Sequence, residues 1–275
     1  MVSINSNYAA SFAANAAKQT QAGLDSAMEK LSTGKRINYA KDDAAGQAIA
    51  TRLTAEIQGL AMASRNAADG QSMLDTADGA LQETHNLLLR MRELAVQSAN
   101  GTLQASDRTA LGAEFDALEA EVTRISDNTS WAGTKLLDGS LSSGVTFHVG
   151  SGASQTITHS IPEMAASAAT MGIVAAVAIT DVTKANSAIG QLDVAIAGVS
   201  KQRAEIGAVS NRLDATVSNL NQVKLNLSSS KGRIEDADFA QETSNLAKNQ
   251  ILQQAATAML AQANASKQTV LTLVR

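Results

Sequence analysis

Residues 189–227 read IGQLDVAIAGVSKQRAEIGAVSNRLDATVSNLNQVKLNL, and this stretch decides the fold. Steps of alternately three and four residues pick out a stripe in which nine of twelve positions are apolar: Ile189, Leu192, Ile196, Val199, Arg203, Ile206, Ser210, Leu213, Val217, Leu220, Lys224 and Leu227. A sustained heptad of this kind is typical of a coiled-coil seam. The helix would be about 58 Å long. That length favours a rod-like bundle over a single amphipathic helix in an ordinary bundle.

The N-terminal half supplies partners for this helix. One stripe, with a shift of phase near residues 75–77, comprises Ile49, Leu53, Ile57, Leu60, Ala67, Leu74, Leu81, Leu88, Met91 and Ala95. Asn100-Gly101 is a turn signal that should end the first helix, with glycine as its C-terminal cap. A shorter stripe comprises Leu111, Phe115, Leu118, Val122 and Ile125. We expect this second helix to begin at the N-cap residues Ser106 and Asp107 and to end at residues 127–130.

The middle of the chain predicts a small β-hairpin. Val145, Phe147 and Val149 alternate with polar residues, and Ile157, His159 and Ile161 do the same after a Gly-Ser-Gly turn at residues 150–152. Residues 163–185 show no periodicity that assigns them to a helix or a strand. The weakly apolar run at 164–180 is too rich in Ala, Ser and Thr to predict a membrane span.

The composition excludes several classes of function. The net charge of −4 argues against nucleic-acid binding, and the absence of cysteine removes disulfides, thiolate metal sites and cysteine nucleophiles. Aromatic residues make up only 3%, which suits long helices in close contact better than a globular core. The first seventeen residues carry no charge, unlike a secretory signal.

No catalytic, cofactor or metal site is predicted. The chain has three histidines, His85, His148 and His159, and none begins the His-Glu-x-x-His pattern of zinc proteases. His148 and His159 would bind a metal only if they faced each other across the hairpin, and a solvated or packed pair is the favoured interpretation. Gly34-Lys35 lacks the upstream glycine of a phosphate-binding loop. We therefore expect no enzyme activity and no cofactor.

The two ends of the chain are alike and differ from the middle. Residues 1–45 and 231–275 each hold five basic and four acidic side chains, whereas 46–230 holds 12 basic and 18 acidic ones. Near the C-terminus one helical face carries Leu252, Ala255, Met259, Ala263, Val270 and Leu273, and Asn and Gln fill much of the rest. A stripe this narrow cannot hold an isolated helix together. We interpret it as an interaction segment rather than a disordered tail, and we expect it to become ordered when it packs against copies of itself.

Several motifs at both ends resemble those of bacterial flagellins. The N-terminal ones are LSTGKRIN at 31–38, AKDDAAGQAIA at 40–50, RNAADG at 65–70 and RELAVQSANGT at 92–102. The C-terminal ones are GRIEDADF at 232–239, QILQQAA at 250–256, LAQAN at 260–264 and VLTLVR at 270–275. The resemblance covers about residues 1–140 and 185–275, and its motifs follow the family's order.

The resemblance implies a mainly α fold, with a long antiparallel helical rod or coiled-coil bundle, a small central β-hairpin and paired terminal helices. Residues 1–45 and 231–275 would form the two halves of an inner-tube domain. Residues 46–138 and 186–230 would form the helices of a rod domain, and 139–185 would form a short central segment in place of the family's large variable outer domain.

The resemblance also implies a function and partners. The chain would self-polymerise into the extracellular bacterial flagellar filament for motility, after export in the unfolded state by the flagellar type III apparatus. Expected partners are other subunits, an export chaperone at the C-terminal segment, and hook-associated and cap proteins. Arg90, Leu94 and Glu114 match the positions that the family presents to the vertebrate innate-immune flagellin receptor. The same residues would otherwise serve as lateral contacts between subunits.

Two other functions fit the same patterns. One is the flagellin-like junction protein between hook and filament, against which the near-complete C-terminal motifs argue. The other, from a different class, is an intracellular coiled-coil scaffold. Recovery of the protein in sheared extracellular filaments, rather than in the cytosol, distinguishes the flagellin and the junction protein from the intracellular scaffold.

Overall fold

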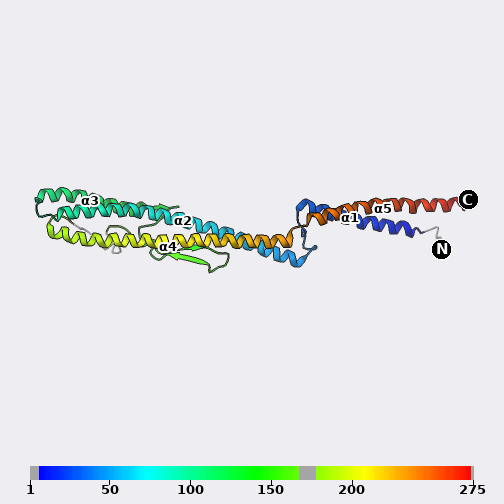
Figure 1. Ribbon diagram of the computed structural model, residues 1–275, viewed down its shortest axis with the longest axis horizontal. Helices are drawn as coiled ribbons and strands as arrows, with labels where there is room; N and C mark the ends of the chain where they lie inside the picture. Colours follow the sequence, from blue (N-terminus) through cyan, green and yellow to red (C-terminus); the bar gives the residue numbers. More distant parts are fainter. Residues whose placement is uncertain (1–5, 167–177, 274–275) are drawn as a thin grey trace. The chain divides into compact units, whose positions relative to one another are not determined.

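The computed structural model describes residues 6–166 and 178–273, with side chains described as far as residue 266 (Figure 1). The elements in these residues are α1 Tyr8–Thr33, α2 Ala44–Ser98, α3 Ala105–Asn128, β1 Ser130–Trp131, β2 Thr134–Lys135, β3 Val145–His148, β4 Thr156–His159, α4 Val182–Glu235 and α5 Phe239–Leu273. The expected mainly α fold with a small β-hairpin is confirmed. Within the segment 163–185 that the sequence left unassigned, residues 167–177 lie outside the described residues.

The chain divides into two compact units. One is residues 58–224, and the other joins the two ends, residues 1–57 and 225–275. The domain boundaries expected from the sequence fall at different positions, after residues 45 and 230, and they remain a prediction.

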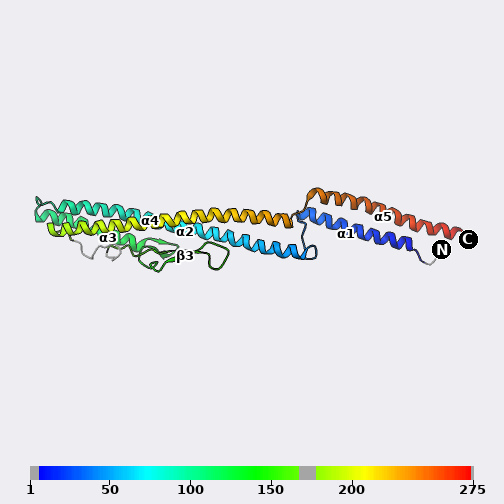
Figure 2. The same ribbon diagram turned by 60° about the horizontal axis from the view of Figure 1, so that its bottom comes forward.

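In the unit of residues 58–224, α2, α3 and α4 lie side by side (Figures 1 and 2). Their buried side chains form one core, to which Leu81, Phe115 and Leu192 contribute from the three helices. The shift of phase predicted for the α2 stripe is absent. Small residues occupy alternate positions of the stripe, and they are missed when only large apolar side chains are counted. The buried positions at steps of three and four run Leu60, Ala63, Ala67, Gly70, Leu74, Ala77, Leu81, Thr84, Leu88, Met91, Ala95 and Ser98, and Met73 and Leu94 beside them are buried as well.

The buried face of α4 is wider than the predicted seam. Leu192, Val199 and Ile206 are buried as expected, but the other buried positions of each heptad are Ala188, Ala195 and Gln202. Their predicted counterparts Ile189 and Ile196 are only partly buried. A seam between two helices buries a narrow stripe. The face is wider here because α4 also contacts the hairpin, through Gln202.

Two predicted helix ends differ in detail. Gly101 does not have the left-handed conformation of a glycine cap, so that expectation is wrong. The Arg108 guanidinium serves the end of α2 instead, since it donates to the Ser98 and Asn100 carbonyls at 3.0 and 2.9 Å. Asp107 is not an N-cap but lies inside α3, where its carboxylate accepts from the Gln104 amide at 3.0 Å.

The predicted hairpin is present and packs on the helices. Val145 pairs with His159, and Phe147 with Ile157, in antiparallel register. The Phe147 ring lies over Gly70 of α2, where a Cβ would come within 2.7 Å of the ring. The Asn66 amide donates to the His148 carbonyl at 3.2 Å. The absent side chain at position 70 therefore lets the hairpin approach α2 closely.

In the other unit, the segment after α1 is tied to the segment between α4 and α5. Gly34 ends α1 with φ of 70°, a conformation that favours glycine. Its carbonyl accepts from the Ala237 amide at 3.0 Å, and the Arg36 amide donates to the Glu235 carbonyl at 2.7 Å. Lys35 lies 2.5 Å from the Glu235 carboxylate and lowers its pKa.

Candidate functional site

The pair of terminal helices, α1 and α5, is antiparallel and held mainly by polar side chains. The Thr20 hydroxyl donates to the Gln253 side-chain carbonyl at 2.6 Å, and the Asn7 amide donates to the Ala263 carbonyl at 3.2 Å. Lys30 pairs with Glu242 at 3.5 Å. These contacts fix the register of the two helices. Each contributes little to stability, because a hydrogen bond within the protein replaces one that the same group makes to water in the unfolded chain.

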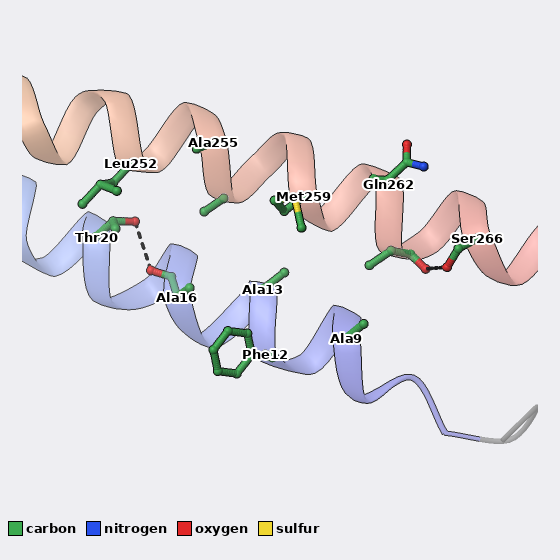
Figure 3. Close-up of a pocket in the computed structure, with 12 residues that line it drawn as sticks. Ala9, Phe12, Ala13, Ala16, Thr20, Leu252, Ala255, Met259, Gln262 and Ser266 are labelled. Atoms are coloured by element: carbon green, nitrogen blue, oxygen red, sulfur yellow. Dashed lines mark hydrogen bonds between the residues drawn. The ribbon is translucent and has the colours of Figure 1, made fainter. Parts of the chain in front are cut away.

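The apolar contact between these helices is thin. The buried side chains along α1 and the described part of α5 are all alanines: Ala13, Ala27 and Ala256. Beside them runs an open groove of ≈ 450 Å³, toward which Leu252 and Met259 reach from α5 while Ala13 faces them from α1 (Figure 3). Alanine buries too little area to offset the entropy of ordering two long helices.

Large apolar side chains on the same pair remain exposed. Those with at least about two fifths of their surface exposed are Tyr8 (78%), Phe12 (80%), Met28 (49%), Phe239 (60%), Ile251 (66%), Leu252 (41%) and Met259 (63%). Exposed apolar side chains gathered on one pair of helices mark an interaction surface. Three of these side chains, Phe12, Leu252 and Met259, line the groove, which therefore has the composition of a surface that another helix covers.

The structure brings most of the predicted packing residues to this groove. Leu252, Ala255, Met259 and Ala263 line it. The side chains of Val270 and Leu273 lie outside the described residues. Phe12, which lines the groove from α1, is not among the residues predicted to pack there. The signal was present, since Tyr8 and Phe12 are two of the few aromatic residues and lie one helical turn apart.

The three residues matched to receptor contacts differ in accessibility. Arg90 and Glu114 are about half exposed and form an ion pair at 2.8 Å between α2 and α3. Hydrogen bonding to Glu114, then to Glu93, raises the pKa of Arg90. Leu94 is only 1% exposed, because it points into the core of the 58–224 unit. Arg90 and Glu114 therefore form the accessible part of the set.

The hairpin histidines do not face each other. His148 is paired with Thr156 and His159 with Val145, which places the two side chains on opposite faces of the hairpin. His148 is exposed, whereas His159 is 7% exposed and contacts Gln202 at 3.2 Å. The register thus excludes a metal site between these two rings. In the residues that the structure describes, no group of three or more metal-binding side chains is found.

None of the helices within the described residues combines the length and apolar character that crossing a membrane requires.

Comparison with known proteins agrees with this architecture. The model of the bacterial flagellin N-terminal helical region matches residues 4–142, and that of the C-terminal helical region matches residues 189–274. The chain is 46% identical to a flagellin of Halalkalibacterium halodurans, with 90% of this chain and 91% of the relative covered. It is 42% identical to the flagellin of Bacillus subtilis and to the flagellar filament 33 kDa core protein of Treponema phagedenis, each with 99% of both chains covered.

Solved structures give the same result. The crystal structure of Bacillus cereus flagellin is 31% identical and superposes with a TM-score of 0.51, covering 57% of this chain and 88% of that one. A putative flagellar hook-associated protein of Vibrio parahaemolyticus shares the fold with a TM-score of 0.60 at 17% identity.

Proposed function

The chain belongs to the bacterial flagellin family and is a structural subunit of the flagellar filament, not an enzyme, and from this premise we propose that the α1–α5 groove is the surface through which subunits pack. The observation that carries the proposal is the exposure of Phe12, Leu252 and Met259 beside a helix contact whose buried side chains are all alanines. Family membership implies an extracellular filament. The relatives named as filament proteins do not favour the hook junction or the scaffold.

The energetics support packing between copies. Burying one large apolar side chain stabilises an assembly by about 1.5–3 kcal/mol. A neighbouring α5 in the groove would cover Leu252 and Met259 on one subunit and present its own apolar stripe in return. The same stripe continues in sequence through Val270 and Leu273. Each subunit would thereby gain the apolar burial that its own helix pair lacks.

A charge placed in the groove tests this proposal. Met259→Asp would put a carboxylate where a neighbouring helix packs, and it should abolish polymerisation on seeding, measured by light scattering and electron microscopy. Because Met259 is 63% exposed in the single chain, the thermal unfolding of the variant should match that of the unchanged protein. Met259→Leu is the matched control and should polymerise. Normal filaments from Met259→Asp would contradict the proposal.

We also propose that the α5 segment binds an export chaperone before assembly, and that the family's type III apparatus exports the chain. The support is the same exposed apolar face, which needs a cover in the cytosol to prevent premature polymerisation. Hook-associated and cap proteins are proposed as partners at the filament ends. Loss of chaperone binding in Leu252→Asp, measured by calorimetry against Leu252→Met, checks the first of these proposals.

For the innate-immune receptor, we propose that Arg90 and Glu114 make the contact. The support is their exposure and their shared ion pair. Arg90→Ala should lower the signal of a receptor-reporter assay, whereas Arg124→Ala, which removes another exposed ion-paired arginine, should not. Leu94 is a poor test residue, because truncating a buried leucine costs about 2–5 kcal/mol of stability. Equal signals from the two arginine variants would exclude this assignment.

A further inference from the structure

The loop between α2 and α3 holds Asn100-Gly101, and we propose that Asn100 is a site of spontaneous deamidation. An asparagine side chain is attacked by the backbone nitrogen of the next residue, and glycine in that place offers no side chain to hinder the attack. Asn100 and Gly101 are both exposed and lie outside the helices. They are thus accessible to the water and base that the reaction needs.

The backbone amide that must attack is free of hydrogen bonds. In the fully described segment 99–104, every other amide donates to an acceptor. Those bonds run from Ala99 to Ala95 O, from Asn100 to Gln97 O, from Thr102 to Asn100 Oδ1, from Leu103 to Asn100 O and from Gln104 to Asp107 Oδ2. The Gly101 amide has no such acceptor in this segment. An unbonded amide loses its proton and becomes nucleophilic without first breaking a contact of the fold.

The electrophile is polarised by the same turn. The Thr102 amide donates to Asn100 Oδ1 at 3.2 Å. This bond draws electrons from the side-chain carbonyl and stabilises the negative charge that develops on Oδ1 when Cγ becomes tetrahedral. The turn at residues 100–102 therefore leaves the attacking Gly101 amide unbonded and polarises the Asn100 side-chain carbonyl that it attacks.

Two other asparagines, Asn38 in a loop and Asn128 at the end of α3, differ at the attacking nitrogen. After Asn38, the Tyr39 amide donates to Asp42 Oδ2 at 2.9 Å. After Asn128, the Thr129 amide donates to the Ile125 carbonyl at 3.0 Å. Both also precede a residue with a side chain. Asn38 and Asn128 therefore serve as internal controls, whose deamidation can be compared with that of Asn100 in the same protein.

The reaction balances as a loss of ammonia followed by addition of water. The Gly101 nitrogen gives up its proton to solvent base and forms a bond to Asn100 Cγ. Nδ2 takes a proton from solvent and leaves as ammonia as its bond to Cγ breaks, and the product is a succinimide. Water then opens the ring at one of its two carbonyls, giving aspartate or isoaspartate at position 100. The isoaspartyl product lengthens the main chain where Arg108 binds the Ser98 and Asn100 carbonyls. A carboxylate thus accumulates on ageing subunits beside the end of α2.

Peptide mapping by mass spectrometry of the aged full-length protein, with isoaspartate detection, tests the proposal. The Asn100 peptide should convert to acid at least as fast in the folded chain as in a free peptide of residues 97–104, and well ahead of the Asn38 and Asn128 peptides. Protection of Asn100 in the folded chain relative to the free peptide would overturn the proposal.

Gly101→Ala provides a variant that does not disturb the fold. A Cβ at position 101 meets nothing within 4 Å, and the residue is not in the left-handed region. The conversion rate should fall about tenfold, equivalent to about 1.4 kcal/mol in the barrier. Unchanged conversion in Gly101→Ala would show that the Gly101 nitrogen is not the attacking group, and would also overturn the proposal.

Discussion

At the residue scale, His159 is a buried polar group that links the hairpin to α4. The Gln202 amide nitrogen donates to the His159 ring at 3.2 Å and to the Ser160 carbonyl at 3.3 Å. Because that nitrogen only donates, His159 Nε2 must be unprotonated. Burial lowers the pKa of His159, and the charge of Glu205 partly opposes this effect. A proton on Nε2 would therefore set two donors against each other.

This arrangement predicts a loss of stability in mild acid. The folded pKa lies below the unfolded value, so the unfolded chain binds the proton first as pH falls. The stability from neutral His159 is present above about pH 6.5 and is lost as pH falls through the folded pKa. The thermal midpoint of His159→Gln should fall less over that range than that of the unchanged protein. The exposed His148→Gln is the control, and it should keep the full decrease.

At the element scale, α2 alternates large and small residues along its buried face. At Gly70 the hairpin approaches the helix closely, since a Cβ there would lie 2.7 Å from the Phe147 ring. Gly79, nine residues further along the same helix, has nothing within 4 Å of the site of a Cβ. Both are interior helical glycines, and they differ in what surrounds them.

Alanine at these two positions should have opposite effects. Gly79→Ala should stabilise the protein by about 1 kcal/mol, because alanine favours the helix. Gly70→Ala should destabilise it by about 1–3 kcal/mol, because the added methyl forces the Phe147 ring and its strand to move. Urea unfolding of the two variants measures the difference in the free energy of unfolding. A gain in stability at both positions would show that the hairpin does not depend on Gly70.

At the scale of the whole molecule, the two units differ in how they are stabilised. The 58–224 unit has a continuous core of Leu, Met, Phe and Val from three helices and a hairpin. The α1–α5 pair has alanine contacts and exposed aromatic residues. One unit should therefore fold without neighbours, while the other should depend on them.

Removal of residues 243–275 tests that division of roles. The truncated chain should fail to polymerise on seeding, because most of α5 and its groove residues are gone. Its thermal unfolding should stay unchanged, because the core of residues 58–224 is intact. Circular dichroism of the full-length protein should show helix content rising on polymerisation, and limited proteolysis of the monomer should trim both ends. Filaments from the truncated chain would disprove the dependence on neighbours.

The sequence by itself determined the helical class, the hairpin and the family. Heptads over α2 and α4, alternation around Phe147, and motifs at both ends are local patterns, and periodicity reports local structure directly. The exposed groove was also predictable in part, since Leu252 and Met259 share one helical face.

Only the tertiary structure decided which neighbours those faces meet. It set the wider buried face of α4 at Gln202, the unbroken stripe of α2 through Gly70, and the burial of Leu94 beside the exposed Arg90. The physical reason is that small and polar residues carry no hydrophobic signal of their own. Their place in a core is fixed by a partner distant in sequence, such as Phe147 for Gly70 or His159 for Gln202.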